Sequence, residues 1–142
     1  VDRHPSRDEV VVACADGKPK LFRMDVKAAP AGGGNPNQIR EFPAMPGRVF
    51  DVSFSSDGSR FVAGSSLDGK GHVWLFETDS GKKLLEVEGD RGGVFAVSFS
   101  PDGKTFSFGG FDGSVNLADA ETGKVIKEFV PVEVQAKVAA NK

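Results

Sequence analysis

Hydrophobic and polar residues alternate along this chain in short runs that stop at tight turns. One such run, Val94 to Gly103 (VFAVSFSPDG), repeats an earlier run, Val49 to Gly58 (VFDVSFSSDG). A third, more divergent copy lies at the start of the sequence. Alternation with a period of two predicts β-strands, and the Asp-Gly pair that ends each run predicts a turn.

Aligning Val1, Val52 and Val97 divides the chain into three units, the last two of which are 45 residues apart. Each unit contains four short apolar runs separated by turn residues. The expected strands are 1–5 (a stub), 9–13, 19–23 and 39–42, then 49–55, 60–64, 72–76 and 83–88, then 94–100, 105–108, 115–118 and 125–130. A period of about 40–45 residues built from four strands is typical of a propeller blade. We therefore predict an all-β fold of β-propeller-type blades, each with four antiparallel strands, and about three blades in this chain.

The predicted boundaries place blade 1 at 1–45, blade 2 at 46–90, blade 3 at 91–131 and a tail or extra strand at 132–142. Blade 1 has an incomplete first strand and a glycine-rich segment at 26–38. That segment is too poor in apolar residues to offset its ordering entropy, so it should form a mobile loop. Residues 134–140 have helical propensity but no cap, and an extended tail or the first strand of a further blade fits them equally.

Composition narrows the possible partners. The 18 basic and 20 acidic residues are interspersed and give a net charge of −2, which argues against a nucleic-acid-binding face. No apolar run approaches the ~18 residues of a membrane span. The single cysteine, Cys14, excludes an internal disulfide and a thiolate metal cluster, and we expect it to pack in a strand. The chain starts at Val1 without a signal peptide, which favours a soluble, cytoplasmic protein but also fits a processed or trimmed N-terminus.

Candidate catalytic residues are scarce. His4 and His72 lie in different units, and neither has neighbours at metal-ligand spacing. The Asp-Gly pairs lack the acidic ladder of a calcium loop, so turn formation is their expected task. These turn residues are Asp16, Gly17, Asp57, Gly58, Asp68, Gly69, Asp102, Gly103, Asp112 and Gly113. No catalytic residue, cofactor site or metal site is predicted, and the chain does not read as an enzyme.

The segments 95–103 (FAVSFSPDG) and 111–119 (FDGSVNLAD) together resemble a blade of the WD-repeat β-propeller family. The resemblance covers about 130 residues, but this sequence lacks two residue pairs that are typical of the family. The family's Trp-Asp pair falls on Ala118-Asp119, Phe76-Glu77 and Phe22-Arg23, and its Gly-His pair falls on Gly89-Asp90. The Asp–His–Ser–Trp network of such blades therefore cannot form as a set. We expect packing to hold the blades together, with Asp16, Asp68 and Asp112 accepting backbone N–H groups in their turns.

The resemblance also implies a binding face, at the side of the propeller where the chain enters each first strand. Positions of that face fall on Phe50, Phe95, Leu67 and Phe111, with Arg48 and Arg91 beside them. Aromatic residues with arginine are a common hot-spot composition. A second interpretation assigns Phe50 and Phe95 to the core between blades. In an alternating strand, each would lie on the same face as apolar residues that are expected to be buried.

Three blades do not close a ring, since propellers of this kind carry about 4–8. Either further blades exist, or two copies form a homo-oligomer that closes a six-blade ring. We therefore predict a non-catalytic protein-interaction or scaffold module whose partners are other proteins or further blades. The alternatives are structural blades of a larger multidomain protein, a self-assembling propeller and, third, an enzyme with a site in the propeller channel.

Overall fold

The computed structural model describes residues 1–25, 28–29, 31–89 and 92–131, and these ranges contain strands, turns and loops but no helix. The strands form three four-stranded antiparallel sheets. They are β1 (Asp2–Arg3), β2 (Glu9–Val12), β3 (Lys20–Arg23), β4 (Gln38–Glu41), β5 (Arg48–Phe54), β6 (Arg60–Leu67), β7 (Lys70–Glu77), β8 (Lys83–Gly89), β9 (Val94–Phe99), β10 (Thr105–Gly110), β11 (Val115–Asp119) and β12 (Val125–Phe129). The predicted all-β class with four-stranded blades is confirmed.

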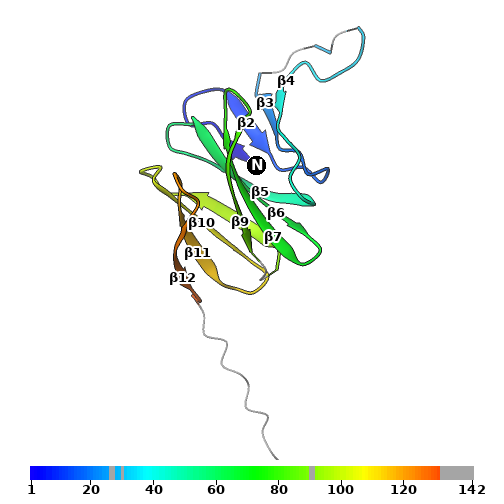
Figure 1. Cartoon of the computed structure of the whole chain (residues 1–142). Helices are drawn as coiled ribbons and strands as arrows, with labels where there is room; N and C mark the ends of the chain where they lie inside the picture. Colours follow the sequence, from blue (N-terminus) through cyan, green and yellow to red (C-terminus); the bar gives the residue numbers. More distant parts are fainter. Residues whose placement is uncertain (26–27, 30, 90–91, 132–142) are drawn as a thin grey trace, which may run out of the picture.

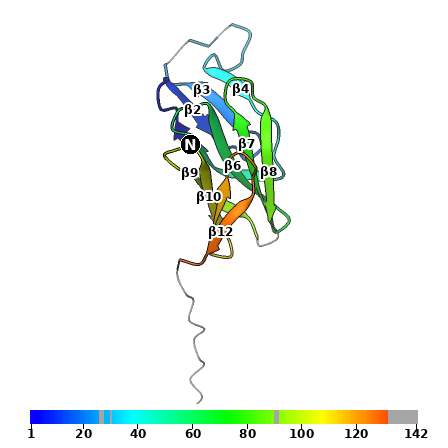
Figure 2. The same cartoon turned by 60° about the vertical axis from the view of Figure 1, so that its left-hand side comes forward.

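Within each sheet the strands follow their order in the sequence, so every blade is a simple meander. We call β1–β4 blade 1, β5–β8 blade 2 and β9–β12 blade 3. The three blades lie in a fan with blade 2 between the others (Figure 1; Figure 2 turns the view by 60°). The first strands of neighbouring blades contact one another, β1 with β5 and β5 with β9. The tail expected at 132–142 lies outside the described residues.

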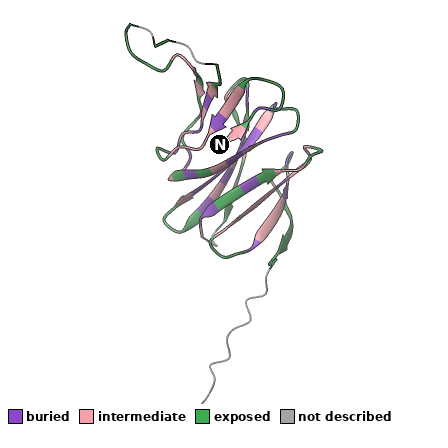
Figure 3. Ribbon diagram, turned by 180° about the vertical axis from the view of Figure 1, so that it is seen from behind, coloured by how far each residue is buried: buried purple, intermediate pink, exposed green. Residues whose placement is uncertain are grey.

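Two hydrophobic cores fill the spaces between the blades, and blade 2 contributes to both. Alternate residues of β6 point to opposite sides: Phe61 and Ala63 belong to the core with blade 1, while Val62 belongs to the core with blade 3. This is the period of two expected of a strand buried on both faces. Figure 3 shows the buried stretches along these strands, whereas β12, which leads to the grey trace, is exposed throughout. Among the described residues, nothing covers the face of blade 1 or of blade 3 that points away from blade 2.

In blade 2, phenylalanines occupy the space around the family's missing tryptophan. Phe76 and Ala118, which stand at the tryptophan positions of blades 2 and 3, are both fully buried. The ring of Phe76 stacks on Phe61 with 5.1 Å between centroids, and Phe42 meets Phe61 edge-on at 4.7 Å. Such ring pairs add to the stabilisation that burial gives. Ring packing within and between the sheets therefore fills this position in blade 2.

The hairpin between β6 and β7 differs from the sequence expectation. The pattern predicts that the strands end at Gly64 and resume at His72, but they continue to Leu67 and begin again at Lys70. Asp68 and Gly69 form a two-residue turn with φ of 50° and 79°. Positive φ at both central residues is the geometry of a type I′ hairpin turn, for which Asp-Gly is a preferred sequence. The two strands are therefore longer than the alternation shows.

Cys14 also departs from its predicted place in a strand. It follows the end of β2, is half-buried, and its thiol donates to the carbonyl of Val12 at 3.7 Å. Desolvation by burial raises the pKa of the thiol, so the unreactive protonated form is favoured at neutral pH.

Candidate functional site

The turn aspartates hold the loops of the blades through local hydrogen bonds. In blade 2, Asp57 accepts the hydroxyl of Ser55 at 2.7 Å and the backbone N–H of Ser59 at 3.0 Å. These bonds favour the carboxylate and lower the pKa of Asp57 to about 2, the Ser55 hydroxyl being the largest cause. Asp102 repeats the arrangement in blade 3, where the Ser100 hydroxyl is again the main reason for a lowered pKa.

The other turn aspartates divide into two kinds. Asp16 and Asp112 each accept a backbone N–H two residues onward, at 3.0 Å. Asp68 accepts no backbone hydrogen bond in the described part of the chain and instead takes the first positive-φ position of its turn. The glycine of every pair has a positive φ: Gly17, Gly58, Gly69, Gly103 and Gly113.

A β-bulge in each of the first strands of blades 2 and 3 turns a phenylalanine outward. In β5, Val49 pairs with Ser65 and Asp51 pairs with Gly64, so the residue between them has no cross-strand partner. That residue is Phe50, and Phe95 has the same place in β9. The preceding valines enter the cores, while Phe50 and Phe95 keep 43% and 44% of their surface exposed. The structure therefore does not place these two phenylalanines in the core between the blades.

The two exposed phenylalanines meet on the rim, which we define as the surface formed by Arg48, Phe50, Leu67, Phe95 and Phe111. The rings of Phe50 and Phe95 pack edge-to-face with 4.9 Å between centroids. The guanidinium of Arg48 lies 5.7 Å from the Phe50 centroid and forms no ion pair with a described carboxylate. Arg48 is thus held over an aromatic face with its charge open to solvent. Arg91 lies outside the described residues.

An apolar groove of about 650 Å³ adjoins these rings between blades 2 and 3. Phe111 on its wall is 80% exposed, and Leu67 on the neighbouring hairpin is 45% exposed. The backbone N–H of Phe111 donates to the carbonyl of Gly93 at 3.1 Å, which ties the two loops together. The groove is lined by Ser66, Gly69, Gly92, Gly93, Phe95, Phe111 and Asp112.

Sequence reasoning missed two adjacent glycines, Gly92 and Gly93, that line this groove. We call this pair the glycine floor. A side chain at Gly93 would come within 2.5 Å of the Ser66 hydroxyl, and one at Gly92 within 2.8 Å of the Phe111 side chain. The pair of glycines directly before the first strand of blade 3 was the available signal, because paired glycines often mark a close approach of backbones.

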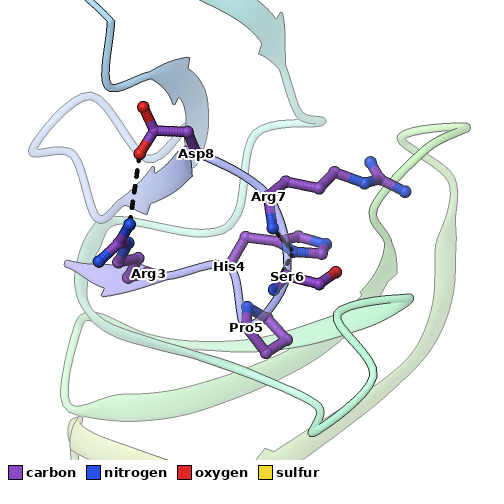
Figure 4. A pocket seen from close by; sticks show the side chains of 6 residues that line it. All are labelled: Arg3, His4, Pro5, Ser6, Arg7 and Asp8. Carbon is purple, nitrogen blue, oxygen red and sulfur yellow. Dashed lines mark hydrogen bonds and ion pairs between the residues drawn. The ribbon is translucent and has the colours of Figure 1, made fainter.

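A second hollow, of about 560 Å³, surrounds the turn after β1 (Figure 4). The His4 side chain in it is buried, and its Nδ1 accepts the backbone N–H groups of Ser6 and Arg7 at 3.2 and 3.1 Å. Arg7, which also lines the hollow, binds both carboxylate oxygens of Asp79, at 2.6 and 3.0 Å. By register, His4 stands where blade 2 has Ser55. These side chains hold a turn and dock it on blade 2, and we assign the hollow a structural role.

The described residues contain no group of three or more His, Cys, Asp or Glu side chains arranged to hold a metal ion. Within the same ranges, no helix has the length and apolarity needed to span a bilayer.

Comparison with known families agrees with this architecture. Residues 67–139, just over half of the chain, match the family model described as the WD40 domain of anaphase-promoting complex subunit 4. Residues 36–74 match the model described as WD domain, G-beta repeat. None of the curated proteins matches the chain. The matched ranges cover the hairpins and turns that form the rim, and the chain belongs to the WD40-repeat family of β-propeller proteins.

Proposed function

We propose that the chain is a non-catalytic interaction module that binds a protein partner on its rim. WD40 domains serve as interaction and scaffold modules. The observation that carries the proposal is Phe111, a large aromatic residue that remains 80% exposed beside an apolar groove. Folding does not bury this side chain, whereas a partner would, and burying a phenylalanine contributes about 1.5–3 kcal/mol.

The geometry indicates the chemistry of the partner. An aliphatic or aromatic side chain would fill the groove beside Phe95 and Phe111, and a carboxylate would meet Arg48 across the Phe50 ring. The loops that carry these residues are fixed by the Phe111–Gly93 hydrogen bond and the Asp68–Gly69 turn. Because the rim is ordered before binding, association loses little conformational entropy.

The test is a comparison of captured proteins with four versions of the chain as bait: wild type, Phe111→Ala, Arg48→Ala and the control Ile126→Ala. Ile126 is 57% exposed on β12, outside the rim. A hot-spot truncation costs at least about 2 kcal/mol, so the true partner should be retained at least tenfold less by Phe111→Ala. It should bind Ile126→Ala as it binds wild type.

Thermal unfolding of the same variants separates binding from folding. Truncation of so exposed a side chain should change the unfolding free energy by no more than about 0.5 kcal/mol. If all four baits retain the same proteins equally, or if Phe111→Ala clearly destabilises the fold, the rim is not the binding surface.

A further inference from the structure

We propose that the free faces of blades 1 and 3 are the two halves of one blade junction, and that two copies of this chain join them head-to-tail. The inference concerns surfaces away from the rim and does not depend on the proposed function. Its starting point is a hydrogen bond that recurs between neighbouring blades.

At both junctions within the chain, a side chain on the first strand of one blade accepts a backbone N–H from the first strand of the next. Asp2 Oδ2 accepts the N–H of Phe54 at 2.7 Å, and Ser53 Oγ accepts the N–H of Phe99 at 3.2 Å. The acceptors are equivalent by register, because Asp2 pairs with Val11 as Ser53 pairs with Val62. The two junctions therefore share one hydrogen bond at equivalent positions, beside the apolar cores that join the blades.

Blade 3 presents the same acceptor on its free face. Ser98 pairs with Ser107 as Ser53 pairs with Val62, but Ser98 is exposed and its hydroxyl has no partner among the described residues. Behind it, Val115 and Leu117 are half-buried. They stand at the positions by which blade 2 receives blade 3, namely Val73 and Leu75. A shallow groove of about 220 Å³ crosses this face and is lined by Ala96, Val97, Ser98, Ser107, Phe108, Gly109 and Val115.

Blade 1 presents the complementary half. Arg3 pairs with Val10 as Phe54 pairs with Phe61, so the N–H of Arg3 has the place of the N–H that Asp2 binds on blade 2. Within the chain this N–H donates to Oδ1 of the adjacent Asp2 at 2.9 Å, and a second copy would offer it the Ser98 hydroxyl as an acceptor. The half-buried side chains beside it are Val10, Val12 and Phe22. They correspond by register to Phe61, Ala63 and Phe76, through which blade 2 packs on blade 1.

A second copy supplies both missing halves at once. Blade 3 of one copy would receive blade 1 of the other, and the same contact would recur on the opposite side. A head-to-tail contact that closes after two copies gives a ring of six blades, within the range of about 4–8 for propellers. Contact between two like faces would not place a donor opposite Ser98, so the register favours head-to-tail association.

Sedimentation equilibrium of the 142-residue chain tests the proposal. The expected mass is twice the monomer value of 15.0 kDa. Leu117→Glu and Val10→Lys should each give a monomer, because each places a charge in an apolar junction. The two substitutions combined in one chain should recover part of the dimer, since they place opposite charges on the two sides of each junction. Phe111→Ala, on the rim, should keep the dimer mass.

Ser98 gives a milder test that leaves the packing intact. Ser98→Ala removes one hydrogen bond per junction and should weaken dimerisation about fivefold per junction. Ser98→Asp, which copies the acceptor used by Asp2, should retain it. A monomer at about 100 µM overturns the proposal, as does an assembly that grows beyond two copies. A dimer that either folded single charge variant leaves unchanged also overturns it, with circular dichroism as the check on folding.

Discussion

Gly110 shows, at the scale of a single residue, how closely two backbones approach beside the groove. A Cβ at this position would lie 1.8 Å from the carbonyl oxygen of Gly93. Gly110→Ala must therefore push β10 away from the segment that leads into β9, against the Gly110–Val94 pairing. We expect a loss of about 2–4 kcal/mol in the free energy of unfolding, measured by urea denaturation.

Gly89 is the matched control, because a Cβ there meets nothing within 4 Å and its φ is not positive. Gly89→Ala should change the unfolding free energy by no more than about 0.5 kcal/mol. If the two substitutions cost the same, the loss at Gly110 reflects strand propensity and not the contact with Gly93.

Asp57 gives the turn network a measurable pH dependence. Its pKa is about 2 in the folded chain, against ~3.9 for an unperturbed aspartate, so the carboxylate stabilises the fold above about pH 4. This stabilisation disappears as the pH falls toward 2. Because Asp57 is exposed, solvent screening limits the benefit to about 1 kcal/mol. Asp57→Asn should lower the unfolding free energy by that amount at pH 7.

Urea denaturation between about pH 6 and pH 3 checks this prediction, since the difference between wild type and Asp57→Asn should shrink toward the acid end. Asp68→Asn is the control, because Asp68 accepts no backbone hydrogen bond among the described residues. A difference that stays constant over this range would contradict a role for the ionised carboxylate.

At the scale of elements, Arg60 at the start of β6 fastens blade 2 to blade 3. Its guanidinium donates to the carbonyls of Gly103 and Ala120 at 2.8 and 3.3 Å and lies 5.8 Å from the ring of Phe99. Arg60→Ala leaves both carbonyls without this donor, and we expect a loss of about 1.5–3 kcal/mol in unfolding free energy. Arg60→Lys keeps the charge but not the forked geometry, so it should recover less than half of the loss. Full recovery would mean that charge alone holds the two blades.

The alternating pattern predicted the elements well, because the strands of each blade follow period-two runs that end at Asp-Gly or Gly-rich turns. It could not predict the bulges. Phe50 alternates in sequence with Val52 and Phe54, which indicates a shared face, yet one extra residue in β5 moves Phe50 outward and Val49 inward. A bulge depends on cross-strand pairing, which a single strand does not encode.

The candidate site was likewise predicted only in part from the sequence. The resemblance selected Phe95 and Phe111, and the structure brings both to one groove. The pattern alone left Phe95 between core and surface, since burial depends on the neighbouring blade. The glycine floor at Gly92 and Gly93 arises from the approach of segments distant in sequence, for which alternation carries no information.

At the scale of the whole molecule, the stability of the fold is unevenly distributed. Blade 2 is covered on both faces, and the largest fully buried side chains, including Phe61 and Phe76, gather around it. Within the described ranges, blades 1 and 3 are each packed on one side only. A second copy covering their free faces would raise stability without changing a contact inside the chain.

Because association of two copies would stabilise the fold, thermal unfolding should depend on protein concentration. If unfolding releases two chains from a ring, a tenfold rise in concentration stabilises the dimer by about 1.4 kcal/mol. For a dimer of this size the unfolding midpoint should rise by about 2 °C, as scanning calorimetry at about 5 and 50 µM would show. Leu117→Glu, which removes the association, should give a lower midpoint that does not move with concentration. A wild-type midpoint that is equally fixed would mean that the end blades are stable with their outer faces in water, because packing on blade 2 alone would then hold them.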